Sequence, residues 1–115
     1  MQLMISESRL QLYRMQADIC KTMSDPKRLM IVHELREGEL PVGELAARLE
    51  LPQANISQHL SLMRKRGIVT TRREGTSIYY SLASRKIADA CDTVQCVLAE
   101  QLEGNRELAK LLDAA

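Results

Sequence analysis

The sequence predicts a mainly α-helical fold with a small β element, the winged helix-turn-helix, and two stretches of the chain predict it. Residues 42–66 combine a short amphipathic helix, a break at Leu51-Pro52, and a second helix with polar side chains on its outer faces. Residues 68–82 contain two runs of strand-forming residues around a glycine turn, the pattern of a two-stranded wing. We therefore expect four helices, a two-stranded ribbon, a long helix and a short last helix within one domain, 1–115.

The composition is compatible with one domain that has a modest aliphatic core. The chain has 115 residues, of which 45% are hydrophobic and only 3% aromatic, so aliphatic side chains must fill the interior. No stretch is apolar enough to span a membrane, and no basic-then-apolar leader is present. The three cysteines do not form the pattern of a secreted disulfide framework, so we expect a cytoplasmic protein.

Two helices are expected before the helix-turn-helix. The first covers about residues 8–23, because four residues at helical spacing share one face: Leu10, Tyr13, Ala17 and Cys20. The second has a sharp start signal, since Asp25 is a good N-cap and Pro26 fits the first helical position. It is predicted to run to Gly38, a residue type that commonly ends helices.

The helix-turn-helix follows from the spacing of its apolar residues. In its first helix they recur at i, i+3, i+4 and i+7, at Val42, Leu45, Ala46 and Leu49. In its second helix three residues are expected to point inward and Gly67 to end the helix; the three are Ile56, Leu60 and Met63. In proteins of this architecture the second helix enters the major groove of DNA.

The wing is predicted from residue type and from its turn. Residues 68–71 are β-branched, Glu74-Gly75-Thr76 is a hairpin turn signal, and residues 77–82 form the second strand. Arg72 and Arg73 lie near the predicted tip. At that place they could contact phosphates or the adjacent minor groove.

Two further helices complete the chain. A long helix is expected from about residue 84 to 103, after which Gly104-Asn105 interrupts it and residues 106–114 form a short helix. The helices at 8–23 and 84–114 have apolar stripes that so small a domain cannot easily cover. We expect them to pair across a two-fold axis, which places two recognition helices roughly 34 Å apart on one face of DNA. The alternative for the long helix is an ordinary core within one chain.

Charge is unevenly distributed, although the formal net charge is only +1. No acid occurs among residues 64–73, a segment that contains Arg64, Lys65, Arg66, Arg72 and Arg73. From Ile87 to the end there are six acids and only two basic residues. A basic centre beside an acidic end favours a polyanionic partner for one face, with a merely solvated charged surface as the alternative.

The candidate DNA-contacting residues lie on the second helix of the pair and on the wing. Amide side chains can bond bidentately to adenine, and hydroxyls and arginines can bond bases or phosphates. The predicted set is Gln53, Asn55, Ser57, Gln58, His59, Ser61, Arg64, Arg72 and Arg73. The alternative for the set is an exposed polar face, and for His59 it is support of the helix or a bond to phosphate. His33, in the second helix of the chain, is expected to be a packed or partly buried histidine and not a ligand.

The order of elements and several motifs resemble the ArsR/SmtB family of bacterial and archaeal winged-helix repressors. The motifs are Asp25-Pro26-Lys27-Arg28-Leu29, Gly43-Glu44-Leu45-Ala46, Asn55-Ile56-Ser57-Gln58-His59-Leu60, Gly67-Ile68-Val69, Gly75 and Tyr79-Tyr80. The resemblance covers roughly residues 12–103. It implies a homodimer that binds double-stranded operator DNA, represses, and is released by an inducer. Inducers in that family include transition metals, arsenite or antimonite, and reactive sulfur or oxidants that act on thiols.

Two departures from the family limit what the resemblance implies about an inducer. Many metal- and arsenite-sensing members carry Cys-Val-Cys at the start of the third helix, whereas residues 41–43 here are Pro-Val-Gly. Other members hold zinc on the fifth helix with Asp, His and Glu. Here Asp89 is followed by Cys91, and no histidine occurs after His59. Neither site can be transferred, so the identity of any metal is unknown.

Cys20, Cys91 and Cys96 are the candidate sensing residues. Cys20 and Cys91 fall on the apolar stripes of their helices, and Cys96 lies roughly opposite Cys91. If these two helices pack at a dimer interface, Cys20 and Cys91 could form a disulfide or polysulfide bridge. They could also bind a soft thiophilic metal or metalloid ion such as As(III). The alternative is that they are small buried hydrophobic residues.

These observations favour a sequence-specific DNA-binding repressor whose partners are operator DNA and a second copy of the chain, without a membrane. They do not indicate an enzyme, because no phosphate loop, Cys-x-x-Cys or nucleophile–histidine motif occurs. Three alternatives stay open. They are a winged-helix protein-interaction module, a DNA-binding regulator that needs no inducer, and a thiol-based metal carrier.

Overall fold

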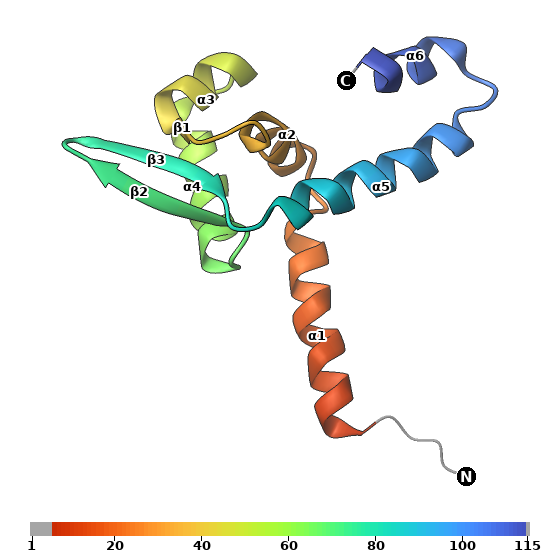
Figure 1. Ribbon diagram of the computed structural model, residues 1–115, viewed down its shortest axis with the longest axis horizontal. Coiled ribbons are helices and arrows are strands. Elements are labelled where there is room, and N and C mark those ends of the chain that lie inside the picture. The colour runs from red at the N-terminus through yellow and green to blue at the C-terminus, as the bar shows by residue number, and fades with distance from the viewer. Residues whose placement is uncertain (1–5, 115) are drawn as a thin grey trace.

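The computed structural model describes residues 6–114 and shows a helical body from which a hairpin and helical arms project (Figure 1). Residues 1–5 and 115, which belong to the predicted domain, lie outside the described part. The predicted order of elements is confirmed, with one added strand. The elements are α1 Glu7–Thr22, α2 Pro26–Leu35, β1 Leu40–Pro41, α3 Val42–Leu49, α4 Gln53–Lys65, β2 Val69–Glu74, β3 Ser77–Leu82, α5 Arg85–Gln101 and α6 Arg106–Ala114.

The start of α2 follows the predicted capping pattern. Asp25 Oδ1 accepts hydrogen bonds from two backbone N–H groups of the first turn, at 2.8 and 3.3 Å, and Pro26 occupies the first position. The helix ends at Leu35, three residues before the predicted Gly38. The N–H of Gly38 bonds to the carbonyl of Leu35 at 3.3 Å, so a turn satisfies the last carbonyl groups in place of a further helical turn.

The core is aliphatic, as the composition requires, and lies where α2, α3 and α4 meet the base of the wing. In α4 the three residues predicted to point inward are all fully buried. Ile68 and Val69 extend the same core under the wing, and Ala88 brings the start of α5 onto it. The buried apolar residues are Ile31, Val32, Leu35, Leu40, Leu45, Ala46, Ile56, Leu60, Met63, Ile68, Val69 and Ala88. This core holds the helix-turn-helix and the wing in one unit.

The wing belongs to a three-stranded antiparallel sheet with the order β1-β3-β2, whereas the sequence predicted two strands. The added strand β1 is only two residues long and pairs Leu40 with Tyr80 and Pro41 with Tyr79. So short a strand directly before a helix has no periodicity of its own. The predicted hairpin turn is present: Glu74 pairs with Ser77, and Gly75 between them has φ +63°.

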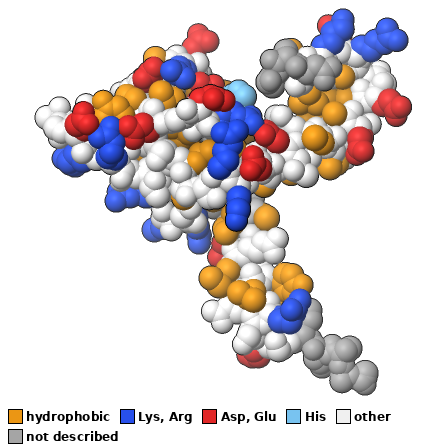
Figure 2. Space-filling view, viewed as in Figure 1, with side chains coloured by type: hydrophobic (Ala, Val, Ile, Leu, Met, Phe, Trp, Pro, Cys, Tyr) orange, Lys and Arg blue, Asp and Glu red, His pale blue; other side chains and the backbone are white. Residues whose placement is uncertain are grey.

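The arms leave most of their apolar side chains uncovered. Every residue of α1 except Thr22 is exposed, and α1 points away from the body (Figure 1). Figure 2 shows hydrophobic side chains gathered on α1 and on the α5–α6 arm. The exposed large apolar residues of these arms are Leu10, Leu12, Tyr13, Met15, Ile19, Val94, Val97, Leu98, Leu108 and Leu111. Among the described residues, no helix has the length and apolar character needed to cross a membrane.

Candidate nucleic-acid interface

The outer face of α4 presents a row of polar side chains. Its buried residues face the core, which turns the intervening positions outward. Five of the predicted contact residues on this helix are exposed: Gln53, Ser57, Gln58, Ser61 and Arg64. The two others, Asn55 and His59, are half-buried and face neighbouring elements. The exposed residues therefore define one surface that can reach base edges and phosphates.

Asn55 differs from the exposed row. Its Oδ1 atom is buried and has no hydrogen-bond partner in the described chain. A bidentate bond to adenine needs both the oxygen and the nitrogen of an amide. Asn55 can therefore make such a contact only if its side chain turns, whereas the exposed Gln58 needs no such change.

His59 contacts a neighbouring helix, as expected for the alternative in which it supports α4. Its Nδ1 atom lies 3.3 Å from Arg28 Nη1, and the Nε of the same guanidinium donates to the carbonyl of Thr22 at 2.6 Å. Because a guanidinium only donates, a hydrogen bond between these two atoms requires Nδ1 to accept. Sequence reasoning missed this partner, since Arg28 precedes His59 by 31 residues and no local pattern joins them.

Arg72 is not an isolated positive charge on the wing. Its guanidinium donates to both carboxylate oxygens of Glu39, at 3.1 and 2.6 Å, and to Glu74 at 2.7 Å. Its Cζ atom also lies 4.7 Å from the centre of the Tyr79 ring. Hydrogen bonds to Glu39 and Glu74 raise the pKa of Arg72, and the bond from Arg72 lowers the pKa of Glu39. Residues 64–73, which include no acid, are thus partly neutralised in the folded chain by carboxylates outside that segment.

Arg73 has a different environment from its neighbour. It is exposed, and within residues 6–114 it takes part in none of the ion pairs. Arg66, at the end of α4, pairs with Asp18 at 3.6 Å. An open groove of about 370 Å³ separates the wing from the helix-turn-helix; its lining residues are Pro41, Val42, Gly43, Ser57, Thr76, Ser77, Ile78 and Tyr80. The polar row of α4 and Arg73 are therefore the members of the predicted set that are exposed and take part in none of the ion pairs of residues 6–114.

The three cysteines are free thiols in different environments. Cys20 is exposed on α1, and Cys96 is exposed on α5, where it lines an open cleft of about 670 Å³ between α2, α5 and α6. Cys91 is half-buried against the core; this burial, with a smaller contribution from Asp92, raises the pKa of its thiol. No cluster of three or more metal-ligating side chains occurs within residues 6–114.

His33, expected to be packed or partly buried, is exposed at this cleft.

Comparison with known proteins agrees with this geometry. The model of the arsR family of bacterial regulatory proteins matches residues 25–71. The biofilm growth-associated repressor of Agrobacterium fabrum is 43% identical over 89 residues, which are 75% of this chain and 76% of that protein. The chain belongs to the ArsR family. An ArsR-family protein of this kind is a DNA-binding transcriptional regulator and not an enzyme.

Two further relatives extend the match to this ArsR-family chain. The transcriptional activator HlyU of Vibrio cholerae is 44% identical over 69 residues, 60% of this chain and 64% of that protein. The structure of its reduced form has a TM-score of 0.70 and 33% identity, and covers 79% of this chain and 99% of that one. A homodimeric winged helix-turn-helix domain from Mycobacterium bovis has a TM-score of 0.78 and 30% identity, with coverage of 91% and 97%.

Proposed function

We propose that this ArsR-family chain is a homodimeric repressor that binds operator DNA through α4 and the wing. The observation that carries the proposal is the exposed polar row of α4, since amides and hydroxyls on one helix face can bond base edges in the major groove. Gln58 is assigned to a base edge, with Gln53, Ser57 and Ser61 beside it. Arg64 and Arg73 are assigned to phosphates.

The remaining predicted contact residues take supporting roles in this proposal. Arg72 holds the wing against the segment before α3 through its bonds to Glu39. His59 and Asn55 lie at the inner edge of α4, where they position the helix. Sequence preference then depends on the exposed amides, and affinity for the backbone depends on the arginines.

The arms supply the surface for a homodimer. One chain exposes 8392 Å², against about 6300 Å² for a compact protein of this mass. The excess is of the size that a stable dimer buries. The Mycobacterium bovis relative is described as homodimeric, which supports a homodimer, and the exposed apolar side chains of α1 and α5 favour these helices as its interface. The Agrobacterium relative is named a repressor, and we propose the same sign of regulation and a cytoplasmic location, where the operator is.

We further propose that a thiol-reactive species or As(III) releases the protein from DNA through its cysteines. Cys20 and Cys96 are exposed in the single chain, and exposure is a condition for reaction with a small oxidant or metalloid. Cys91 lies on α5, one of the proposed dimer helices, so a change at its thiol would alter the packing of that helix.

The experiment is a titration of reduced protein onto a labelled duplex from upstream of its own gene and onto a scrambled duplex. Gln58→Ala should lower the preference for the specific duplex by about 1–3 kcal/mol, because a base-edge bond is lost. Glu37→Ala, which truncates an exposed side chain after α2 and outside α4, the wing and the arms, is the control and should leave this preference unchanged. Equal weakening on both duplexes would contradict base contact by Gln58. No binding of wild type to either duplex would favour the protein-interaction module.

The inducer is tested with the same duplex in the presence of arsenite, zinc, polysulfide and peroxide. We expect one of the thiol-reactive agents to release the wild type, and the variants to identify the thiols that respond. The variants are Cys20→Ser, Cys91→Ser and Cys96→Ser. Tight binding that no agent disturbs would contradict cysteine sensing and favour an inducer-independent regulator. Stoichiometric metal binding without any effect on DNA binding would favour a metal carrier.

A further inference from the structure

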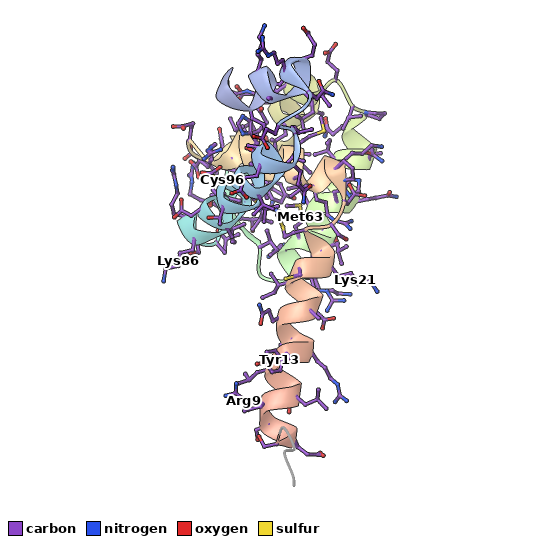
Figure 3. All side chains as sticks on the ribbon, turned by 90° about the vertical axis from the view of Figure 1, so that its right-hand side faces the viewer. Arg9, Tyr13, Lys21, Met63, Lys86 and Cys96 are labelled. Carbon is purple, nitrogen blue, oxygen red and sulfur yellow. The ribbon has the colours of Figure 1, made fainter. Side chains whose placement is uncertain are left out.

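The α1 helix is joined to the rest of the chain only near its end. Thr22 is its single buried residue, and Met23 after it packs against the core. Figure 3 shows α1 as a stalk, with Lys21 beside the body and with Tyr13 and Arg9 far from it. The direction in which α1 leaves the body therefore depends on the few contacts at its C-terminal end.

One of these contacts is made by a side chain from α2. The carbonyl of Thr22 accepts a hydrogen bond from Arg28 Nε at 2.6 Å. The usual helical donor for this carbonyl would be the N–H of the residue four positions later, which is Pro26 and has none. The guanidinium thus supplies a missing donor, and its positive charge lies at the negative end of the α1 dipole.

The same guanidinium also contacts the recognition helix. Arg28 Nη1 lies 3.3 Å from Nδ1 of His59, in the middle of α4 and next to Gln58. Arg28 itself is fixed, because it lies in the first turn of α2 and its backbone N–H donates to Asp25. A planar guanidinium with donors in a rigid fork holds two partners in one relative orientation, which a lysine cannot do.

We infer that Arg28 is a positioning residue that sets the angle between the α1 arm and the recognition helix α4. In a dimer held together by α1, this angle determines the distance between the two recognition helices and hence the half-site spacing that they fit. The second link between the two helices, Asp18 with Arg66 at 3.6 Å, joins exposed side chains and constrains the angle less. The consequence for DNA spacing rests on the function proposed above, whereas the angle itself does not.

The angle is tested without DNA, by electron paramagnetic resonance distances within one chain. Spin labels are attached through Arg14→Cys on α1 and Ser61→Cys on α4, in a background of Cys20→Ser, Cys91→Ala and Cys96→Ser. Labelled protein is diluted with unlabelled chain so that distances within a chain dominate. We expect Arg28→Met to broaden or shift the distance distribution, and Lys27→Met, which removes the same charge from the adjacent position, to leave it unchanged. Identical distributions for the two variants would overturn the inference.

A second variant protects the test against a failure of Arg28→Met to fold. His59→Leu removes only the α4 branch of the contact and keeps the bond to Thr22. It is expected to broaden the same distribution, and a distribution like that of wild type would count against the inference. Dimer content and melting temperature are measured for each variant, so that loss of fold is recognised as such.

The consequence for DNA is measured on duplexes whose half-sites are moved apart by one base pair. Wild type and Lys27→Met should lose about tenfold in affinity or more, and Arg28→Met less than about threefold, because its recognition helices adjust to the new spacing. An equal loss in all three proteins would contradict the link to spacing. Failure of wild type to bind any duplex would contradict the proposed function, and the distance measurement would still decide the role of Arg28.

Discussion

Adjacent residues of one strand can have different environments, and Arg72 and Arg73 of the wing are an example. The side chain of Arg72 is held by two carboxylates and covers the ring of Tyr79. Arg73 has no such partner in residues 6–114 and lies on the other face of the strand. A positive charge that is already paired gains less from a phosphate than an unpaired one.

We therefore predict different effects of Arg73→Ala and Arg72→Ala on DNA binding. Arg73→Ala should weaken binding to specific and scrambled duplexes alike and reduce the slope of log affinity against log salt by about 0.9, the value of one phosphate contact. Arg72→Ala should change this slope less. Fluorescence anisotropy titrations at several salt concentrations measure both. A slope reduced equally by the two substitutions would show that Arg72 leaves its carboxylates on binding.

The thiol of Cys91 is predicted to react slowly with iodoacetamide. Burial raises its pKa, so less thiolate is present at a given pH in the folded protein than in the unfolded one. Mass spectrometry should show its pH–rate profile shifted to higher pH relative to the same cysteine in urea. The raised pKa also makes stability depend on pH. The protonated thiol favours the folded state below the unfolded pKa, and this contribution to the free energy of unfolding is lost as pH rises. Coincident profiles would contradict the shift.

At the scale of single elements, the wing depends on one backbone conformation. Gly75 has φ +63°, and a Cβ atom there would meet no atom within 4 Å. A substitution is therefore penalised by the left-handed backbone and not by a clash. The two-residue turn sets the register of β2 and β3, which in turn places Arg73 at its position opposite Ile78.

Gly75→Ala is predicted to lower the free energy of unfolding by about 1 kcal/mol, the cost of a left-handed alanine. Gly104→Ala is the matched control, because a Cβ atom there also meets open space and the backbone has no positive φ. Urea denaturation followed by circular dichroism measures both. Equal stability of the two variants would indicate that the hairpin relaxes without cost.

At the scale of the whole molecule, a single chain is more extended than a compact protein of its length. Its radius of gyration is 16.9 Å, against about 13 Å for a compact chain of this length. The difference comes from the arms, where most of the large apolar side chains are exposed within the described chain. Exposed apolar surface of this extent indicates an interface.

Leu12→Glu is predicted to convert the dimer into monomers, since this side chain is 63% exposed in one chain and would bring a charge into the interface. Gln11→Glu adds the same charge at the adjacent position and is the control. Sedimentation velocity measures the assembly state, and operator titration should show a loss of about tenfold or more, because the two half-sites would then bind independently. A Leu12→Glu protein that stays dimeric would place the interface elsewhere.

The parts of this protein that the sequence determined depend on residues close together in the chain. The cap at Asp25-Pro26, the apolar spacing of α3 and α4, and the turn at Gly75 are each a local pattern within about two helical turns. The resemblance to the ArsR family rests on the same local motifs. Such patterns predict the elements because their hydrogen bonds and apolar stripes join neighbouring residues.

Only the tertiary structure decided which polar side chains already have partners within the described chain. Glu39 lies 33 residues before Arg72, and Arg28 lies 31 residues before His59, so no local spacing announces either contact. The strand β1 depends likewise on a partner 40 residues away in the chain, at Tyr80. Packing brings these residues together, and the charge or hydrogen-bonding capacity of one is then satisfied by the other. For that reason the sequence predicted the polar helix α4, and the folded chain separated its exposed side chains from its half-buried ones.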